Sequence, residues 1–190
     1  MGKDGLLLEV DDPAAWYQAL VEARSRGAIT AIEIVPAAST VLLAGVADVG
    51  QARAALEHIT PREHQTASSE IEIPIHWDGE DLTAIGERWG ESPEQRLKAT
   101  EFRVAFCGFA PGFAYLAGLP ERFQIPRRDT PRTKVPAGSL ATAGPYVGIY
   151  PRATPGGWHL LGRTETILFD VTKEEPALLT PGINVRFIDA

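Results

Sequence analysis

Cysteine and long apolar runs are nearly absent from this chain of 190 residues. The single cysteine, Cys107, excludes an intramolecular disulfide and any metal site made only of cysteines. No run approaches the length of about 18 apolar residues that a membrane-spanning helix needs, and the N-terminus lacks the basic region and cleavage site of a signal peptide. We therefore expect a cytoplasmic protein that has no membrane partner.

The chain also lacks an excess of basic charge, since its net charge is −7. A nucleic-acid binder needs a basic face to neutralise phosphates, so we expect no nucleic-acid partner. The charge is nevertheless uneven, because residues 101–165 carry a balance of +4 and the rest of the chain carries −11. Residues 108–157 also hold eight of the 18 glycines and eight of the 15 prolines. This composition is typical either of a turn-rich β structure or of ordered loops that contact anions.

The first 65 residues are predicted to form a small ferredoxin-like α/β domain. Strands are expected over residues 5–10, 30–35 and 40–44. Helices are expected to begin after the capping residues Asp12 and Asp48. The resulting order of strand, helix, strand, strand and helix is that of a split βαβ unit, for which residues 71–75 offer a later strand.

A polar stretch without periodicity, residues 62–70, is the expected linker to a second domain over residues 70–190. Two short helices are expected first, over residues 78–89 and after Ser92. Short apolar stretches separated by Gly/Pro turns then favour a closed antiparallel β-barrel, which makes the fold class α+β. The expected barrel strands cover residues 102–106, 139–143, 147–150, 158–161, 166–169 and 185–188.

The strong sequence signatures of catalysis and of nucleotide binding are missing. There is no phosphate-binding loop, no dinucleotide fingerprint, no zinc-protease motif and no nucleophile elbow. The four histidines have no metal-ligand spacing, so we expect no metal and no cofactor bound by this chain. Cys107 has apolar neighbours, and we expect a buried, unreactive thiol rather than a nucleophile.

Loops rich in arginine are the most informative feature of the sequence. Prolines fix φ and glycines permit close backbone approach, so such loops present backbone N–H groups beside arginine side chains that suit carboxylates or phosphates. The candidate substrate-binding residues are Arg127, Arg128, Arg132, Lys134 and Arg163, which we expect to face one cleft. The alternative is that these are surface charges whose aliphatic stems cover the rim of the barrel.

Three residues near these loops are candidate catalytic groups: Ser139, Tyr150 and His159. Ser139 follows Pro136-Ala137-Gly138, a position that suits a nucleophile or a donor to an oxyanion. A serine that starts a strand also commonly bonds to its own turn, and the sequence leaves both interpretations open.

Five motifs follow one another in the second half of the chain. They are GFAPGFAYLAGLP (108–120), PRRDTPRTKVPAGS (126–139), GIYP (148–151), PGGWHLLGRT (155–164) and PGINVRF (181–187). Together they resemble the family that comprises the B subunit of 5-oxoprolinase and allophanate hydrolase subunit 1. Relatives of that family include a bacterial inhibitor of a sporulation histidine kinase and part of the carboxyltransferase domain of urea carboxylase. The resemblance implies a cyclophilin-like barrel after the N-terminal α/β domain.

The resemblance also implies a function, that of a subunit of a multi-subunit amide hydrolase. The complex would be of the 5-oxoprolinase type, which depends on ATP, or of the allophanate hydrolase type. The chain would act on an amide C–N bond only beside a larger second subunit and, in 5-oxoprolinase, a third one, with ATP bound at the level of the complex. The alternatives are a binding module that inhibits a sensor histidine kinase and a carboxyltransferase-like partner subunit.

The chain departs from the family pattern at two places. Leu97 stands where the family usually has a histidine ahead of an aromatic residue, here Phe102. Tyr146 and Val147 stand where the family often has Gln-Thr before Gly-Ile-Tyr-Pro. These losses of polar groups leave the choice between 5-oxoproline, allophanate and another amide open.

Overall fold

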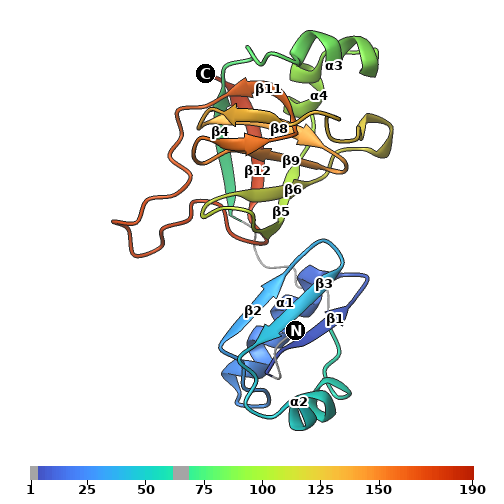
Figure 1. The fold of residues 1–190 in the computed structure, drawn as a ribbon, viewed down its shortest axis with the longest axis vertical. Helices are drawn as coiled ribbons and strands as arrows, with labels where there is room; N and C mark the ends of the chain where they lie inside the picture. The colour runs from blue at the N-terminus through green and yellow to red at the C-terminus, as the bar shows by residue number, and fades with distance from the viewer. Residues whose placement is uncertain (1–3, 62–68) are drawn as a thin grey trace. The chain divides into compact units, whose positions relative to one another are not determined.

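The computed structural model describes residues 4–61 and 69–190, and the chain divides into two compact units, residues 1–67 and 68–190. The predicted linker falls mostly on residues 62–68, which lie outside the described residues, so the domain boundary stays a prediction. Helices and strands occur in both units, which confirms the α+β fold class (Figure 1).

The first unit combines a three-stranded antiparallel sheet with two helices. Its elements are β1 (Leu6–Glu9), α1 (Pro13–Ser25), β2 (Glu33–Pro36), β3 (Thr40–Ala44) and α2 (Val49–Leu56), with sheet order β1-β3-β2. The helices begin where the sequence predicts, because the Asp12 and Asp48 carboxylates accept hydrogen bonds from the N–H groups of Ala15 (3.0 Å) and Gln51 (2.9 Å). The buried Leu20 of α1 packs with the inward side chains of the sheet to form the core of this unit.

The predicted fourth strand of this sheet, residues 71–75, belongs to the second unit instead. It forms β4 (Glu70–Ile75), which pairs in parallel with β12 (Asn184–Asp189). This pairing buries Ile73 and Ile75 in the core of the second unit. The local pattern found the strand but not its partner, because burial against a distant strand decides the pairing.

Seven strands of the second unit form a nearly closed barrel in the order β11-β8-β9-β6-β5-β12-β4. A single bridge between His76 and Arg163 joins the two ends of this sheet. The pairing is antiparallel, as the sequence predicts, except between β4 and β12, which pair in parallel. The remaining barrel strands are β5 (Phe102–Cys107), β6 (Ala114–Ala117), β8 (Ser139–Ala143), β9 (Tyr146–Ile149) and β11 (His159–Arg163).

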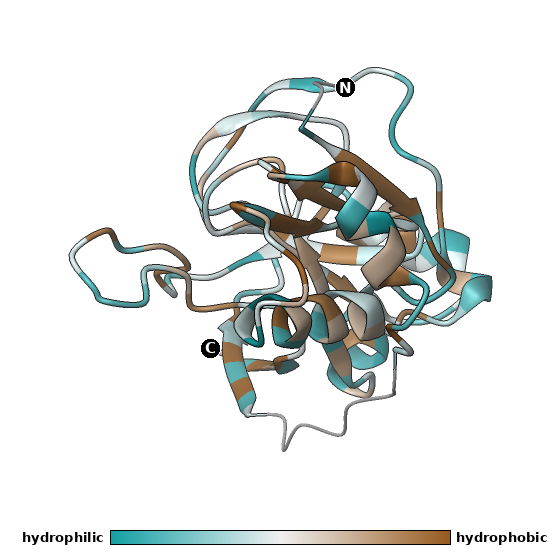
Figure 2. Cartoon of the chain, turned by 90° about the horizontal axis from the view of Figure 1, so that it is seen from below, coloured by the Kyte–Doolittle hydropathy of each residue, from teal (hydrophilic) through white to brown (hydrophobic). Residues whose placement is uncertain are grey.

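Short elements surround this barrel. They are α3 (Leu82–Trp89), α4 (Pro93–Lys98), the 3-10 helix η1 (Glu121–Phe123) and a two-stranded sheet of β7 (Arg132–Val135) and β10 (Thr154–Gly156). Helices α3 and α4 lie at one end of the barrel in Figure 1, and their buried Ile85 and Leu97 join its core. In Figure 2 the strands carry many of the apolar residues.

The expected strand over residues 166–169 is not formed. Within this segment Leu168 is buried and Ile167 is exposed. The backbone bonds within its own loop, since Leu178 N–H donates to Leu168 C=O and Asp170 N–H donates to Pro176 C=O. The apolar pattern therefore marks a folded loop rather than a strand of the barrel.

Candidate functional site

A small pocket with aromatic walls lies on the barrel at the motif residues, and we call it the aromatic pocket. Its volume is about 50 Å³, and it is lined by Phe109, Phe113, Tyr115, Arg127, Tyr150, Gly156, Gly157 and Trp158. The ring of Phe113 makes edge-to-face contacts with Tyr150 and Trp158, at centroid distances of 5.3 and 5.4 Å. A side chain at Gly156 would collide with the Tyr150 hydroxyl, so glycine lets β10 approach this wall.

One rim of the pocket is a strained turn between β5 and β6. The N–H of Ala110 donates to Gly108 C=O (2.7 Å) across Phe109, whose φ is +67°. This is the rare form of γ-turn, and positive φ is costly for an aromatic residue. A Pro111-Gly112 turn follows and holds the strained residue in place. The Phe109 ring is 61% exposed and touches Phe113 edge-on, so it forms the outer wall of the pocket.

Arg127 supplies the positive charge of the pocket. Its side chain is exposed, and within the described residues no hydrogen bond or ion pair engages its guanidinium. Burial raises the pKa of Tyr115 and of Tyr150, and the charge of Arg127 opposes part of that rise. Both hydroxyls therefore stay neutral at physiological pH, and Arg127 keeps its charge available for a ligand.

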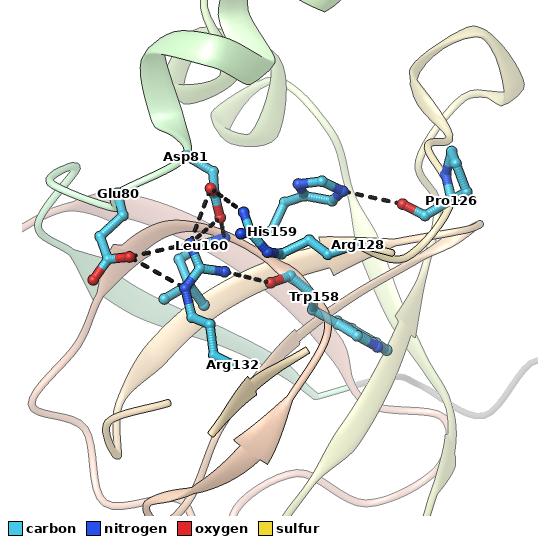
Figure 3. Close-up of polar contacts among 8 residues, drawn as sticks. All are labelled: Glu80, Asp81, Pro126, Arg128, Arg132, Trp158, His159 and Leu160. Atoms are coloured by element: carbon cyan, nitrogen blue, oxygen red, sulfur yellow. Dashed lines mark hydrogen bonds and ion pairs between the residues drawn. The ribbon is translucent and has the colours of Figure 1, made fainter. Parts of the chain in front are cut away.

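Arg128 and Arg132 are held by a buried carboxylate, Asp81, at the start of α3 (Figure 3). Arg132 Nη2 donates to both Asp81 oxygens (3.0 and 2.9 Å), and Arg128 Nη1 donates to Oδ1 (2.9 Å). The N–H of Leu160 on β11 also donates to Asp81 Oδ2 (2.7 Å). We call these four residues the Asp81 cluster.

The electrostatics of the cluster favour the ionised carboxylate. Burial alone raises the pKa of Asp81, but the hydrogen bonds from Arg132 and Leu160 and the charges of both arginines outweigh it, so the pKa lies below its ordinary value. Asp81 is thus an anion at neutral pH. Asp81 binds both Arg128 and Arg132, and Glu80 adds a second ion pair to Arg132, so the two carboxylates together balance the two guanidinium charges.

The arginines of the Asp81 cluster and His159 join the two segments that flank the pocket, residues 126–132 and 157–159. Arg128 N–H donates to Gly157 C=O (2.8 Å), and His159 Nε2 lies 3.0 Å from Pro126 C=O, to which it donates when it carries the proton. Arg132 Nη1 donates to Trp158 C=O (3.3 Å). Arg127 therefore lies between two residues, Pro126 and Arg128, that are both fixed to the opposite wall.

The other predicted binding residues lie elsewhere. Arg163 pairs with Asp78 through its Nε (2.8 Å), and Lys134 is exposed on β7. Of the five candidates, Arg127 lines the pocket, Arg128 and Arg132 support its wall, and Arg163 and Lys134 are not among its lining residues.

The three candidate catalytic groups are already engaged. The Ser139 hydroxyl donates to Pro136 C=O (2.9 Å), which is the turn contact that the sequence left as one alternative. Tyr150 is buried and bonds to the backbone of Trp158, and His159 contacts Pro126. Burial also raises the pKa of the Cys107 thiol to about 11. These contacts favour recognition over covalent chemistry at this site.

The residues that depart from the family pattern have structural roles here. Leu97 is fully buried in the core beside Phe102, where a histidine would place a polar ring. Val147 is buried in the same core, and Tyr146 packs edge-on against Tyr115 (5.6 Å). The departure at Tyr146 thus extends the aromatic wall behind the pocket.

Sequence reasoning missed three important residues: Asp81, Phe109 and Trp158. Asp81 fell inside the helix expected over residues 78–89, yet it precedes α3, its side chain caps nothing and it binds distant arginines instead. Phe109 and Trp158 lie within the motifs GFAPGFAYLAGLP and PGGWHLLGRT. The signal that could have found them was an aromatic residue among glycines and prolines. Among the described residues there is no cluster that would hold a metal ion and no helix long and apolar enough to cross a membrane.

Comparison with known proteins finds relatives that agree with one another. The chain is 48% identical to the B subunit of 5-oxoprolinase from Escherichia coli O157:H7 over 124 residues, which are 62% of this chain and 57% of that protein. The chain therefore spans less than two thirds of the length of this relative.

Solved structures share the fold. The crystal structure of TTHA0988 matches with a TM-score of 0.81 and 33% identity, over 98% of this chain and 40% of that one. Urea amidolyase of Kluyveromyces lactis matches with a TM-score of 0.73 and 19% identity, over 100% of this chain and 14% of that one, which shows the fold alone. The family model "Carboxyltransferase domain, subdomain C and D" matches residues 1–179, and the chain belongs to this family.

Proposed function

We propose that this chain is a recognition subunit of a 5-oxoprolinase-type amide hydrolase, which opens an amide C–N bond at the expense of ATP. The observation that carries the proposal is the aromatic pocket, where an unpaired guanidinium, Arg127, adjoins aromatic walls without a reactive nucleophile. The identity with the B subunit of 5-oxoprolinase supports this type of complex.

Catalysis by positioning and charge stabilisation fits these groups better than covalent catalysis does. A bound substrate held in a fixed orientation lowers the entropic part of the barrier, and a guanidinium stabilises negative charge. Since Ser139 donates to its own turn and the Cys107 pKa is high, we assign the attacking group to another subunit.

ATP does not fit the aromatic pocket. A cavity of about 50 Å³ with one free guanidinium is too small for a nucleotide and too weakly charged for a triphosphate. We therefore assign nucleotide binding to a partner subunit, namely the larger second subunit or a third one.

The test is co-purification of the chain with the subunits encoded beside it, followed by an assay of ATP hydrolysis that depends on 5-oxoproline. We expect activity from the complex and none from this chain alone. Robust turnover by the pure chain, or a complete complex that hydrolyses allophanate but not 5-oxoproline, would overturn the proposal.

The family model favours one second function, a carboxyltransferase-like partner subunit. This function predicts that the chain binds a biotinylated carrier domain. Retention of the chain on an immobilised biotinylated domain, with no effect of 5-oxoproline, would support it over the first proposal.

A further inference from the structure

We infer that the aromatic pocket binds a small, flat ring compound carrying one carboxylate, and that Arg127 binds this carboxylate. The inference deepens the proposed function, on which it rests for the choice of 5-oxoproline as the ligand to be tested. It assigns the substrate to this chain rather than to a partner subunit.

The distribution of charge selects a single carboxylate. Asp81 and Glu80 together balance the charges of Arg128 and Arg132, since Asp81 pairs with each arginine (2.9 Å) and Glu80 pairs with Arg132 (3.1 Å). Arg127 is left as the one guanidinium among the residues that line the pocket. One planar guanidinium donates two parallel hydrogen bonds, which match a carboxylate, whereas a phosphate group usually needs several donors.

The size of the pocket selects a small ring. A cavity of about 50 Å³ admits no more than a few water molecules, since one water needs about 10–15 Å³. A five-membered ring fits this space, with its carboxylate at the rim where Arg127 is exposed. A fused bicyclic ring exceeds it.

The walls favour a flat and neutral ring. Phe113 contacts both Tyr150 and Trp158 edge to face, so the walls are fixed before a ligand arrives. Because burial raises the pKa of Tyr115 and of Tyr150, neither hydroxyl is a competing anion beside the bound carboxylate. A planar lactam has a flat face for the rings and polar edges for the hydroxyls.

Titration of the whole purified chain with 5-oxoproline by calorimetry tests the inference. We expect binding by the wild type, and a ten- to hundredfold loss of affinity in Arg127→Ala, the usual effect of losing a charge-assisted contact. Arg127→Lys, which keeps the charge but loses the planar pair of donors, should lie between them. The matched control is Arg88→Ala, an exposed arginine on α3, which should bind like the wild type.

Two further compounds test the stated chemistry. 2-Pyrrolidinone has the lactam ring without the carboxylate, and indole-2-carboxylate has the carboxylate on a fused ring. Each should bind at least tenfold more weakly than 5-oxoproline.

The inference is overturned if the wild-type chain does not bind 5-oxoproline, if Arg127→Ala binds as the wild type does, or if 2-pyrrolidinone binds equally well. Failure here differs from failure of the proposed function. A complex that hydrolyses 5-oxoproline while this chain does not bind it would refute only this inference. A chain that binds 5-oxoproline within a complex that does not hydrolyse it would refute only the proposed function.

Discussion

Replacement of Asp81 by alanine is expected to destabilise the barrel unit by about 3 kcal/mol. The Asp81 and Arg132 side chains are 12% and 15% exposed, so their ion pair is largely shielded from water. Removing one partner of such a pair typically costs about 3–5 kcal/mol, because the remaining charge is left without compensation. We take the lower end, since Arg128 is 34% exposed and Glu80 still contacts Arg132.

Urea unfolding followed by tryptophan fluorescence measures this loss as a lower free energy of unfolding of the barrel unit. The corresponding fall in melting temperature of this unit is about 12 °C. Asp81→Asn keeps an oxygen that accepts from Leu160 N–H but loses the charge, so about 2 kcal/mol is expected.

The matched control is Glu80→Ala, which removes an exposed carboxylate from the same arginine and should cost less than about 1 kcal/mol. If Asp81→Ala costs no more than this control, the Asp81 cluster does not support the walls of the pocket.

Three further predictions concern single groups. Because the folded-state pKa of Asp81 is lowered, its contribution to stability is complete above the unfolded value of about 4 and is lost as the pH falls through the folded value. Urea unfolding at pH 7, 5 and 3 should therefore show a loss of stability towards low pH that is smaller in Asp81→Ala than in the wild type. Identical pH profiles of the two proteins would contradict this. Since glycine adopts φ of +67° without strain, Phe109→Gly should be about 1 kcal/mol more stable than Phe109→Ala in urea unfolding, and the reverse order would exclude strain at this turn. Cys107, with a pKa of about 11 and its thiol donating to Leu179 C=O (3.4 Å), should react slowly with a thiol reagent at pH 8 until the chain unfolds; full labelling of the native chain within minutes would show the thiolate to be accessible.

Local signals in the sequence predicted the local features of the fold. Asp12 and Asp48 each accept a hydrogen bond from an N–H three residues later, so the whole capping pattern lies within one helical turn of the sequence. The expected strand 139–143 matches β8, because turn residues mark its start and its end. The partner of β4 was not predictable in this way, since it lies on β12 at the far end of the sequence.

The same difference between local and long-range contacts explains which parts of the candidate site could be predicted. The motifs drew attention to Arg127, Arg128 and Arg132, but the arginines looked alike in the sequence. Asp81, which binds Arg128 and Arg132 and leaves Arg127 free, lies 47 and 51 residues away from Arg128 and Arg132. Only the folded barrel brings Asp81 to Arg128 and Arg132. The sequence therefore predicted one cluster of arginines, whereas the structure places Arg127 in the pocket and uses Arg128 and Arg132 to support its wall.

We propose that Arg127 holds the substrate carboxylate of a 5-oxoprolinase-type complex. The most direct measurement is the KM for 5-oxoproline of the purified complex with the wild-type chain and with Arg127→Ala, together with the melting temperature of each chain. We expect the KM of the complex with Arg127→Ala to rise ten- to hundredfold while the melting temperature stays unchanged, because the exposed guanidinium would contact the ligand and not the core. An unchanged KM, or a loss of activity that follows a lower melting temperature, would contradict it.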